Sequence, residues 1–174
     1  MLTGKEILKQ IKKGNIVIEP FDKRRINPNS YNITLSNELL VYDNEMLDAK
    51  KKNTTKTIII PEDGYVLQPN KLYLGRTNEY TKTKKFVPCI SGRSSIGRLG
   101  ICVHITAGFG DVGFEGTWTL EITCVHPVKI YPNMQIGQIY YEKVQGKKTY
   151  YNGKYLGQIK PVASQIQKDE AHPL

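Results

Sequence analysis

Long apolar runs are missing from this chain of 174 residues. A helix that crosses a membrane needs about 20 consecutive apolar residues, and no stretch of the sequence approaches that length. The opening residues, MLTGKEILKQIKKG, also lack the pattern of a secretion signal. We therefore expect no membrane association and a cytoplasmic location.

Cysteine and histidine are scarce, with three residues of each kind. Cys89, Cys102 and Cys124 lie far apart in the sequence, which argues against a disulfide framework. We expect them to be reduced thiols that are buried as small apolar groups. The histidines complete no spacing typical of metal ligands, and His104 in ICVHIT is expected to be a packed structural residue.

Arginine is the rarer of the two strongly basic residue types. The formal net charge of +9 suggests a nucleic-acid partner, but most of the lysines form short scattered runs that suit a solvated surface. The tyrosines show no motif for stacking on bases, so we expect no nucleic-acid binding. Two of the arginines, Arg93 and Arg98, fall instead in one segment rich in glycine and serine.

Turn signals separate many short stretches of apolar alternation. The pattern predicts one helix that follows Thr3, has Glu6 as the second half of a capping box and ends near Gly14. Residues 43–56 read as a surface loop. Strands are predicted at 16–21, 30–36, 38–42, 57–60, 65–68, 71–80, 86–90, 117–122, 128–131 and 135–144. The sequence therefore predicts an all-β sandwich or barrel, with one domain over residues 1–174.

The segment 91–121, SGRSSIGRLGICVHITAGFGDVGFEGTWTLE, holds most of the residues that could carry chemistry. Its first part combines flexible glycines, serine hydroxyl groups and the guanidinium groups of Arg93 and Arg98, a combination that suits a phosphate group. A glycine-rich turn with incidental arginines is the alternative interpretation. No GxxxxGK[ST] motif occurs, so this is not a P-loop.

Two carboxylates follow in the same segment. Asp111 lies in a glycine-rich turn that could present it to a ligand. Glu121 lies between Leu120 and Ile122 on a predicted strand, where burial is costly unless the carboxylate is paired. Such a group suits general acid/base catalysis, whereas a strand that points Glu121 into solvent would make it an ordinary surface residue.

The elements on which zinc-dependent nucleobase deaminases rely are absent. Those enzymes use an H-x-E element and a P-C-x-x-C element. Here Pro88 and Cys89 are followed by residues 90–92, ISG, without a second cysteine. Any deamination of a base by this chain would have to proceed without that zinc site.

Taken as a whole, segment 91–121 closely resembles the signature of the dCTP deaminase family, which is related to the trimeric dUTPases. NPNSYNITL near the start and YNGKYLGQ near the end resemble family segments too, so the resemblance covers most of the chain. It implies a distorted, jelly-roll-like β-barrel of the trimeric dUTPase type. It also implies a homotrimer with active sites between subunits, zinc-free deamination, and Mg²⁺ carried by the triphosphate.

The resemblance further implies catalytic roles. Glu121 corresponds to the glutamate that shuttles protons while water attacks C4 of cytosine. Ser94 and Arg98 correspond to residues that position this water and steady the glutamate. The backbone at Thr106 and Ala107 corresponds to the part that holds the water and the pyrimidine edge.

Substrate contacts are implied in the same way. The residues corresponding to the triphosphate-binding run are Arg93, Ser94, Ser95, Ile96, Gly97 and Arg98. Asp111 corresponds to the residue near the deoxyribose, and Thr119, Leu120 and Glu121 lie along the base. Tyr151, Lys154 and Gln158 correspond to lid contacts in a C-terminal tail of about residues 149–174, whose spacing is shorter than in some members.

Gly108 and Phe109 bear on whether the reaction ends at dUTP. Strictly deaminating members carry a bulky basic pair there, whereas this chain resembles the bifunctional members that release dUMP and diphosphate. In those enzymes the residue corresponding to Asp111 would orient the water that attacks the α-phosphate. Gly110 departs from the apolar residue often found before that aspartate. A monofunctional deaminase, a plain dUTPase and a non-catalytic nucleotide-binding regulator are the alternatives, and dTTP is a candidate inhibitor.

Overall fold

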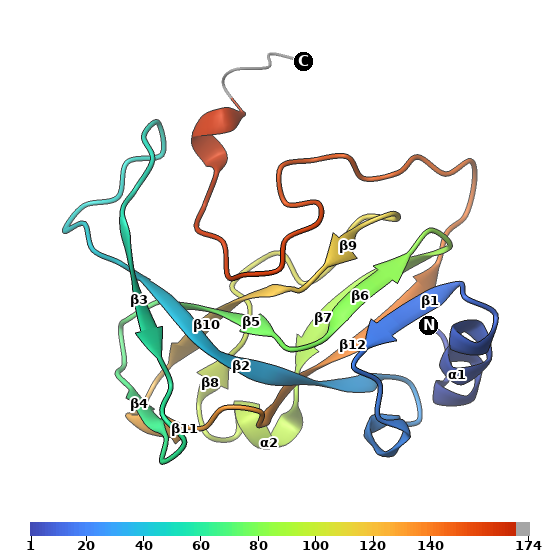
Figure 1. Ribbon diagram of the computed structural model, residues 1–174, viewed down its shortest axis with the longest axis horizontal. Coiled ribbons are helices and arrows are strands. Elements are labelled where there is room, and N and C mark those ends of the chain that lie inside the picture. Colours follow the sequence, from blue (N-terminus) through green and yellow to red (C-terminus); the bar gives the residue numbers. More distant parts are fainter. Residues whose placement is uncertain (170–174) are drawn as a thin grey trace.

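The computed structural model describes residues 1–169 and is built mainly of β-strands (Figure 1). The helical elements are α1 (Gly4–Lys12), η1 (Lys23–Arg25), α2 (Ser94–Gly97) and η2 (Ile166–Lys168). The strands are β1 (Ile16–Glu19), β2 (Tyr31–Tyr42), β3 (Thr55–Ile59), β4 (Tyr65–Leu67), β5 (Tyr73–Thr77), β6 (Tyr80–Thr83), β7 (Phe86–Gly92), β8 (Ile101–Cys102), β9 (Glu115–Gly116), β10 (Thr119–Cys124), β11 (Val128–Ile130) and β12 (Gln135–Lys143). The predicted all-β class is confirmed.

The largest sheet has seven strands and forms a nearly closed barrel. Its main path runs β7-β12-β2-β5-β10-β8, and β3 pairs with β2 beside it. Strands β1, β6 and β9 form a second sheet, and β11 pairs with β4. Inward-facing side chains such as Ile33, Leu39, Ile122 and Ile139 are fully buried and form the core. Among residues 1–169, no helix combines the length and the apolar character that crossing a membrane would require.

Helix α1 begins as predicted, but its capping box is incomplete. The Thr3 hydroxyl accepts a hydrogen bond from the Glu6 backbone N–H at 3.3 Å. The Glu6 carboxylate does not return the bond, because it accepts instead from Gln10 Nε2 at 2.5 Å. The sequence pattern was right about where the helix starts and wrong about the second half of the cap.

The strand predictions need correction at two places. Residues 30–36 and 38–42 belong to one long strand, β2, whose first half pairs with β12 and whose second half pairs with β3. The chain makes no turn between these halves. Instead, the register of β2 against β5 shifts between Leu35 and Leu39. Conversely, residues 71–80 form two strands, because Asn78 and Glu79 leave the ladder to bond with Thr34.

The predicted state of the cysteines is largely confirmed. All three are free thiols. Cys89 and Cys124 are buried, and burial raises the pKa of both thiols above their ordinary value. Cys102 is exposed, so the expectation of burial was wrong for this residue, which lies on the short strand β8 at the end of the sheet.

A buried carboxylate links the start of the chain to the barrel. The Glu79 side chain is fully buried and ion-paired with Arg25, which is itself 14% exposed. It also accepts hydrogen bonds from the Thr34 backbone N–H at 2.9 Å and from the Thr34 hydroxyl at 2.8 Å. The pair therefore ties η1, β2 and the β5–β6 connection together.

Replacing Arg25 should be strongly destabilising. Arg25→Met leaves the Glu79 carboxylate buried without its counter-ion, and we expect a loss of roughly 3–5 kcal/mol in the free energy of unfolding by urea. Arg24→Met is the matched control, since Arg24 forms an exposed pair with Asp22, and its unfolding midpoint should stay near that of the parent. Equal effects of the two substitutions would contradict this role of Glu79.

Candidate functional site

Strand β10 carries the two residues on which the site is built. Along β10, Leu120 and Ile122 point into the core and are 1% and 0% exposed. Because side chains alternate along a strand, Thr119 and Glu121 must lie on the outer face of the barrel. Glu121 there pairs with Leu74 of β5, and Thr119 pairs with Arg76.

A cavity of about 460 Å³ lies over this face. The predicted site residues that line it are Thr106, Ala107, Phe109, Asp111, Thr119, Glu121, Tyr151 and Gln158. Most of the remaining wall is apolar or aromatic and includes Leu74, Phe114, Trp118 and Tyr155. The sequence analysis did not predict these wall residues as site residues. The alternation of inward- and outward-facing side chains along β5 and β10 is the signal that could have placed Leu74 beside Glu121. The resulting space suits a flat ring with a polar edge.

The Glu121 carboxylate accepts one hydrogen bond from the backbone. Its Oε2 accepts from the Ile105 N–H at 2.7 Å, and its own N–H donates to the Val103 carbonyl at 3.0 Å. The side chain is half-buried and faces the cavity rather than open solvent, and within residues 1–169 it has no ion-pair partner. With one oxygen fixed by Ile105, the other is available to a bound molecule.

The loop 105–111 is close-packed at its glycines. Two backbone hydrogen bonds join the loop to β7. The Gly108 carbonyl accepts from the Ile90 N–H at 2.5 Å, and the Gly110 N–H donates to the Pro88 carbonyl at 2.7 Å. A Cβ on Gly110 would lie 2.4 Å from Cη2 of Trp118. The indole therefore occupies the space that a side chain would need at position 110, which explains why this sequence has glycine there.

Gly108 is similarly confined. An added Cβ would lie 3.0 Å from the Ile90 carbonyl oxygen and 3.1 Å from Cε1 of His104. His104 is half-buried beneath the loop, as expected for a structural residue, although its Nδ1 is buried without a hydrogen-bond partner in the described chain. A bulky side chain at position 108 would displace the loop that holds Glu121.

Asp111 occupies the turn that the sequence predicted. Its carbonyl accepts from the Phe114 N–H at 3.1 Å, and Gly113 adopts φ +96°, which favours glycine. The Asp111 side chain is exposed and lines the cavity. The turn thus presents a carboxylate at the cavity, on a different segment from Glu121.

The C-terminal tail contributes residues to the cavity wall, and Figure 1 shows part of this tail passing above β9. Tyr151 N–H donates to the Val112 carbonyl at 2.8 Å, and Gln158 exchanges two bonds of 2.8 Å with the backbone of Thr117. Further on, the Val162 N–H donates to the Thr119 hydroxyl at 3.1 Å. The predicted tail of residues 149–174 is therefore docked as far as residue 169; residues 170–174 lie outside the described part.

Lys154 is placed differently from Tyr151 and Gln158. Its ammonium group lies 2.6 Å from the carboxylate oxygens of Asp169, and it does not line the cavity. Lys154 corresponds to a lid contact in the resemblance, but in this arrangement its charge is neutralised by Asp169.

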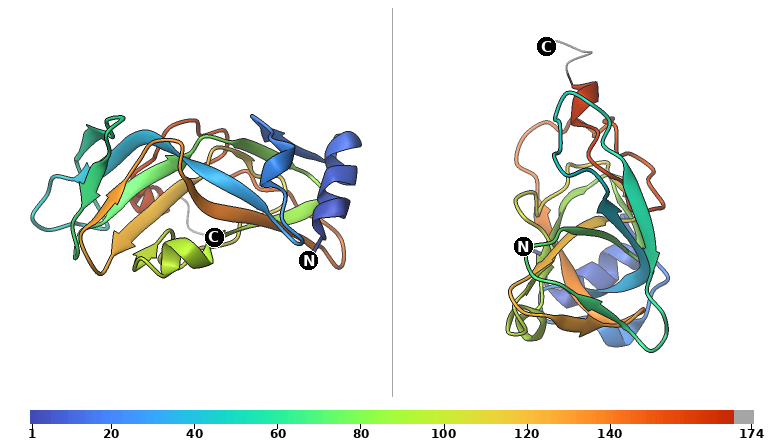
Figure 2. Two further views of the ribbon diagram at one scale, coloured as in Figure 1. Left: turned by 90° about the horizontal axis from the view of Figure 1, so that it is seen from below. Right: turned by 90° about the vertical axis from the view of Figure 1, so that its left-hand side faces the viewer.

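The arginine- and serine-rich run lies elsewhere. None of residues 93–98 lines the cavity, and α2 lies at the bottom of the barrel while the tail lies at the top (Figures 1 and 2). Ile96 is buried and anchors the helix, whereas Ser94, Ser95, Gly97 and Arg98 are exposed. Arg93 donates to the Gln135 carbonyl at 3.1 Å. Leu120 also fails to contact the cavity, since it faces the core.

Because the basic run of residues 93–98 lies away from the cavity, the charged side chains that line the cavity are acidic. Asp111 and Glu121 are its acidic residues, and no lysine or arginine lines it. Within residues 1–169, no three or more His, Cys, Asp or Glu side chains are grouped so that they could hold a metal ion. A single chain thus offers an apolar, acidic cavity and, at a distance from it, an exposed basic run.

Comparison with known proteins identifies the family. A family model described as dCTP deaminase-like matches residues 1–144. The chain belongs to the dCTP deaminase-like family. It is 63% identical over 156 residues to a "dCTP deaminase, dUMP-forming" of Clostridium beijerinckii, covering 89% of this chain and 90% of that protein. It is 59% identical over 170 residues to the protein of the same name from Clostridium acetobutylicum, covering 97% and 98%.

A solved structure supports the fold. The 2'-deoxycytidine 5'-triphosphate deaminase of Agrobacterium tumefaciens superposes with a TM-score of 0.66 at 16% identity. The match covers 82% of this chain and 48% of that one, so this chain spans about half the length of that relative. The predicted barrel of the dUTPase-like type is thereby confirmed.

Gly116 tests whether the tail is docked as described. Its φ is +141°, and a Cβ would lie 2.6 Å from the Gln158 carbonyl oxygen. Gly116→Ala should break the Thr117–Gln158 contacts, and we expect amides of residues 150–165 to exchange with deuterium roughly tenfold faster or more.

Gly14→Ala is the control, because Gly14 has φ +70° with open space around it. It also places an alanine at a positive φ, but without touching the tail. Tail exchange that is unchanged in Gly116→Ala, or accelerated equally in both variants, would refute the docking.

Proposed function

We propose that this chain deaminates dCTP and then cleaves the dUTP formed, so that dUMP, ammonia and diphosphate are released. The observation that carries the proposal is the Glu121 carboxylate, fixed at one oxygen by Ile105 and facing a cavity that suits a pyrimidine. The relatives that match nearly the whole chain are named dUMP-forming dCTP deaminases.

The first step consumes one water. As water adds to C4 of cytosine, Glu121 accepts its proton and delivers protons to N3 and the amino group. The C4–N bond then breaks, ammonia leaves, and a C4 carbonyl remains. Ile105 keeps the carboxylate at a fixed angle, and the apolar walls limit competing water. The backbone at Thr106 and Ala107, on the same loop, is suited to hold the attacking water.

The second step consumes another water, at the α-phosphate. Asp111 lies at the cavity on a turn and would orient this water, so that the bond to the diphosphate leaving group breaks. Gly108 and Phe109 would leave room for this second water, because they replace the bulky basic pair and Gly108 has no side chain to displace the loop. Mg²⁺ would be bound mainly by phosphate oxygens and water, since no metal-ligating cluster is found within residues 1–169.

The triphosphate requires a second chain. The cavity has two carboxylates and no basic side chain, so it cannot neutralise a triphosphate by itself. The exposed run of residues 93–98 supplies the missing arginines and serine hydroxyl groups, but at another part of the barrel. We therefore infer a homotrimer in which this run from one protomer completes the cavity of its neighbour, with Tyr151 and Gln158 as the lid.

Glu121→Gln tests the catalytic assignment. The amide cannot shuttle protons, and we expect ammonia release from dCTP to fall by at least about 10²-fold, while dCTP binding measured by calorimetry stays within a few-fold. Cleavage of added dUTP should persist, since Glu121 has no task at the α-phosphate. If binding and both reactions fall together, Glu121 is structural and the assignment fails.

Mixing inactive variants tests the shared site. Glu121→Gln and Arg98→Gln protomers should each be inactive alone. After mixed refolding in equal amounts, each site draws its two halves from different chains, and about a quarter of the sites (½ × ½) regain both residues. Recovery of deamination to about that fraction is the expected result. No recovery, in mixtures shown to contain both chains, would place both residues in one protomer's site.

A further inference from the structure

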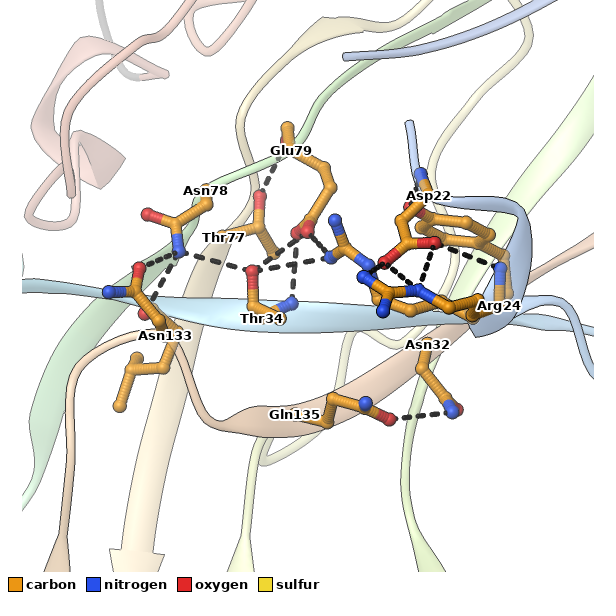
Figure 3. A network of polar contacts seen from close by, with 12 residues as sticks. Asp22, Arg24, Asn32, Thr34, Thr77, Asn78, Glu79, Asn133 and Gln135 are labelled. Carbon is orange, nitrogen blue, oxygen red and sulfur yellow. Dashed lines mark hydrogen bonds and ion pairs between the residues drawn. The ribbon is translucent and has the colours of Figure 1, made fainter. Parts of the chain in front are cut away.

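A second polar groove lies on the outer face of the barrel, apart from the cavity. It has a volume of about 800 Å³ and is lined by Arg24, Arg25, Arg76, Asn78, Asn133 and Gln135, together with Pro20, Asp22 and Thr34. Figure 3 shows Asp22, Arg24, Asn78, Asn133 and Gln135 among the polar residues of this region. We refer to it as the arginine groove. None of these residues lines the cavity that contains Glu121.

The groove and the cavity share one sheet face. Arg76 of β5 is the register partner of Thr119 on β10, and opposed residues of an antiparallel pair point to the same side. Arg76 therefore lies on the face that carries Glu121. On the far side of the groove, the backbone carbonyl of Gln135 accepts a hydrogen bond from the Arg93 guanidinium. The groove thus extends between the cavity and the start of the exposed basic run.

Only one of the three arginines lacks a carboxylate partner in the described chain. Arg24 pairs with Asp22 at 2.8 Å, and hydrogen bonding from Arg24 lowers the pKa of Asp22 to about 2, so this pair is ionised at neutral pH. Arg25 pairs with the buried Glu79. The groove's two acidic neighbours are thereby engaged, and the charge of Arg76 is left uncompensated.

The Arg76 guanidinium is also short of acceptors. Its Nη1 donates to the Thr77 carbonyl at 3.0 Å, and its Nε is buried without a hydrogen-bond partner in the described residues. A buried donor without an acceptor is costly. Because this nitrogen is shielded from solvent, a ligand in the groove would be bound by the charge and the terminal nitrogens of the guanidinium, which make one hydrogen bond, to Thr77, within residues 1–169.

Two amides of the groove are oriented as donors. The Asn133 side-chain oxygen accepts from Asn78 at 2.9 Å, and the Gln135 side-chain oxygen accepts from Asn32 at 2.9 Å, so their NH₂ groups are the ends left to a ligand. Asn78 is oriented the other way, because its NH₂ group donates to Thr34, Leu35 and Asn133 and leaves its oxygen. Donors from β5, from the turn at 133 and from β12 thus outnumber this acceptor, which favours a ligand that is mainly an acceptor.

We propose that the arginine groove is a second anion-binding site, whose ligand is a phosphate group of inorganic diphosphate or of a nucleoside triphosphate. Donors from three segments suit the oxygens of a tetrahedral phosphate, which point in several directions, better than one planar carboxylate. The groove has three arginines and two nearby carboxylates that are both paired, and this excess of positive charge favours an anion over a cation. The site is distinct from the cavity and does not depend on the reaction proposed there.

The test uses Arg98→Gln protein, in which the exposed run is weakened as a competing phosphate site. Calorimetric titration with inorganic diphosphate should still show binding, and adding Arg76→Gln should weaken it roughly tenfold or more. Arg76→Lys should fall between the two, since lysine keeps the charge but loses the fork. Lys5→Gln, which removes an exposed positive charge on α1, should have no effect.

A second arm identifies the source of the phosphate. dCTP is titrated into Glu121→Gln protein with and without Arg76→Gln. A second dCTP-binding event that is lost in the Arg76→Gln protein assigns the groove to nucleotides. If diphosphate binds but no second dCTP-binding event is seen, the groove is assigned to the inorganic anion. Sedimentation of each variant gives the oligomeric state. The proposal is overturned if Arg76→Gln leaves all phosphate binding unchanged. It is also overturned if that substitution only dissociates the subunits, since the groove would then hold a neighbouring copy.

Discussion

The inside–outside alternation of β10 is the constraint on which the site depends. Leu120 and Ile122 fill the core, and because side chains alternate, Glu121 and Thr119 cannot avoid the outer face. A shift of one residue in the register with β5 would bury the carboxylate and expose the core residues. The position of the carboxylate that we propose as catalytic is therefore fixed by the same burial that stabilises the barrel.

The loop 105–111 and the C-terminal tail pack closely around Glu121 and keep its carboxylate in position. The Ile105 N–H holds the carboxylate, Gly110 lets the loop lie against Trp118, and Gly116 lets the tail approach the strand that follows. These contacts join segments distant in the sequence. The cavity is consequently a product of tertiary packing, although its residues come largely from one segment.

The sequence alone predicted the local features well. The strand periodicity located most strands, and it placed Glu121 on a strand between two apolar residues, which are core residues in the structure. Features that depend on long-range contacts were missed: the continuity of β2, the Lys154–Asp169 pair and the aromatic wall. Residues 93–98 and Glu121 are close in sequence, but the barrel separates them, and no local pattern encodes this. The arginine groove brings together residues 24–25, 76–78 and 133–135, three stretches distant in the sequence, and has no motif.

The central claim is that this cavity converts dCTP to dUMP. Phosphorus NMR of the purified protein incubated with dCTP and Mg²⁺, alongside an ammonia assay, tests it most directly. We expect dUMP, diphosphate and ammonia in equal amounts. Ammonia with dUTP would contradict the second step, and diphosphate without ammonia, or unchanged dCTP, would contradict the role assigned to Glu121.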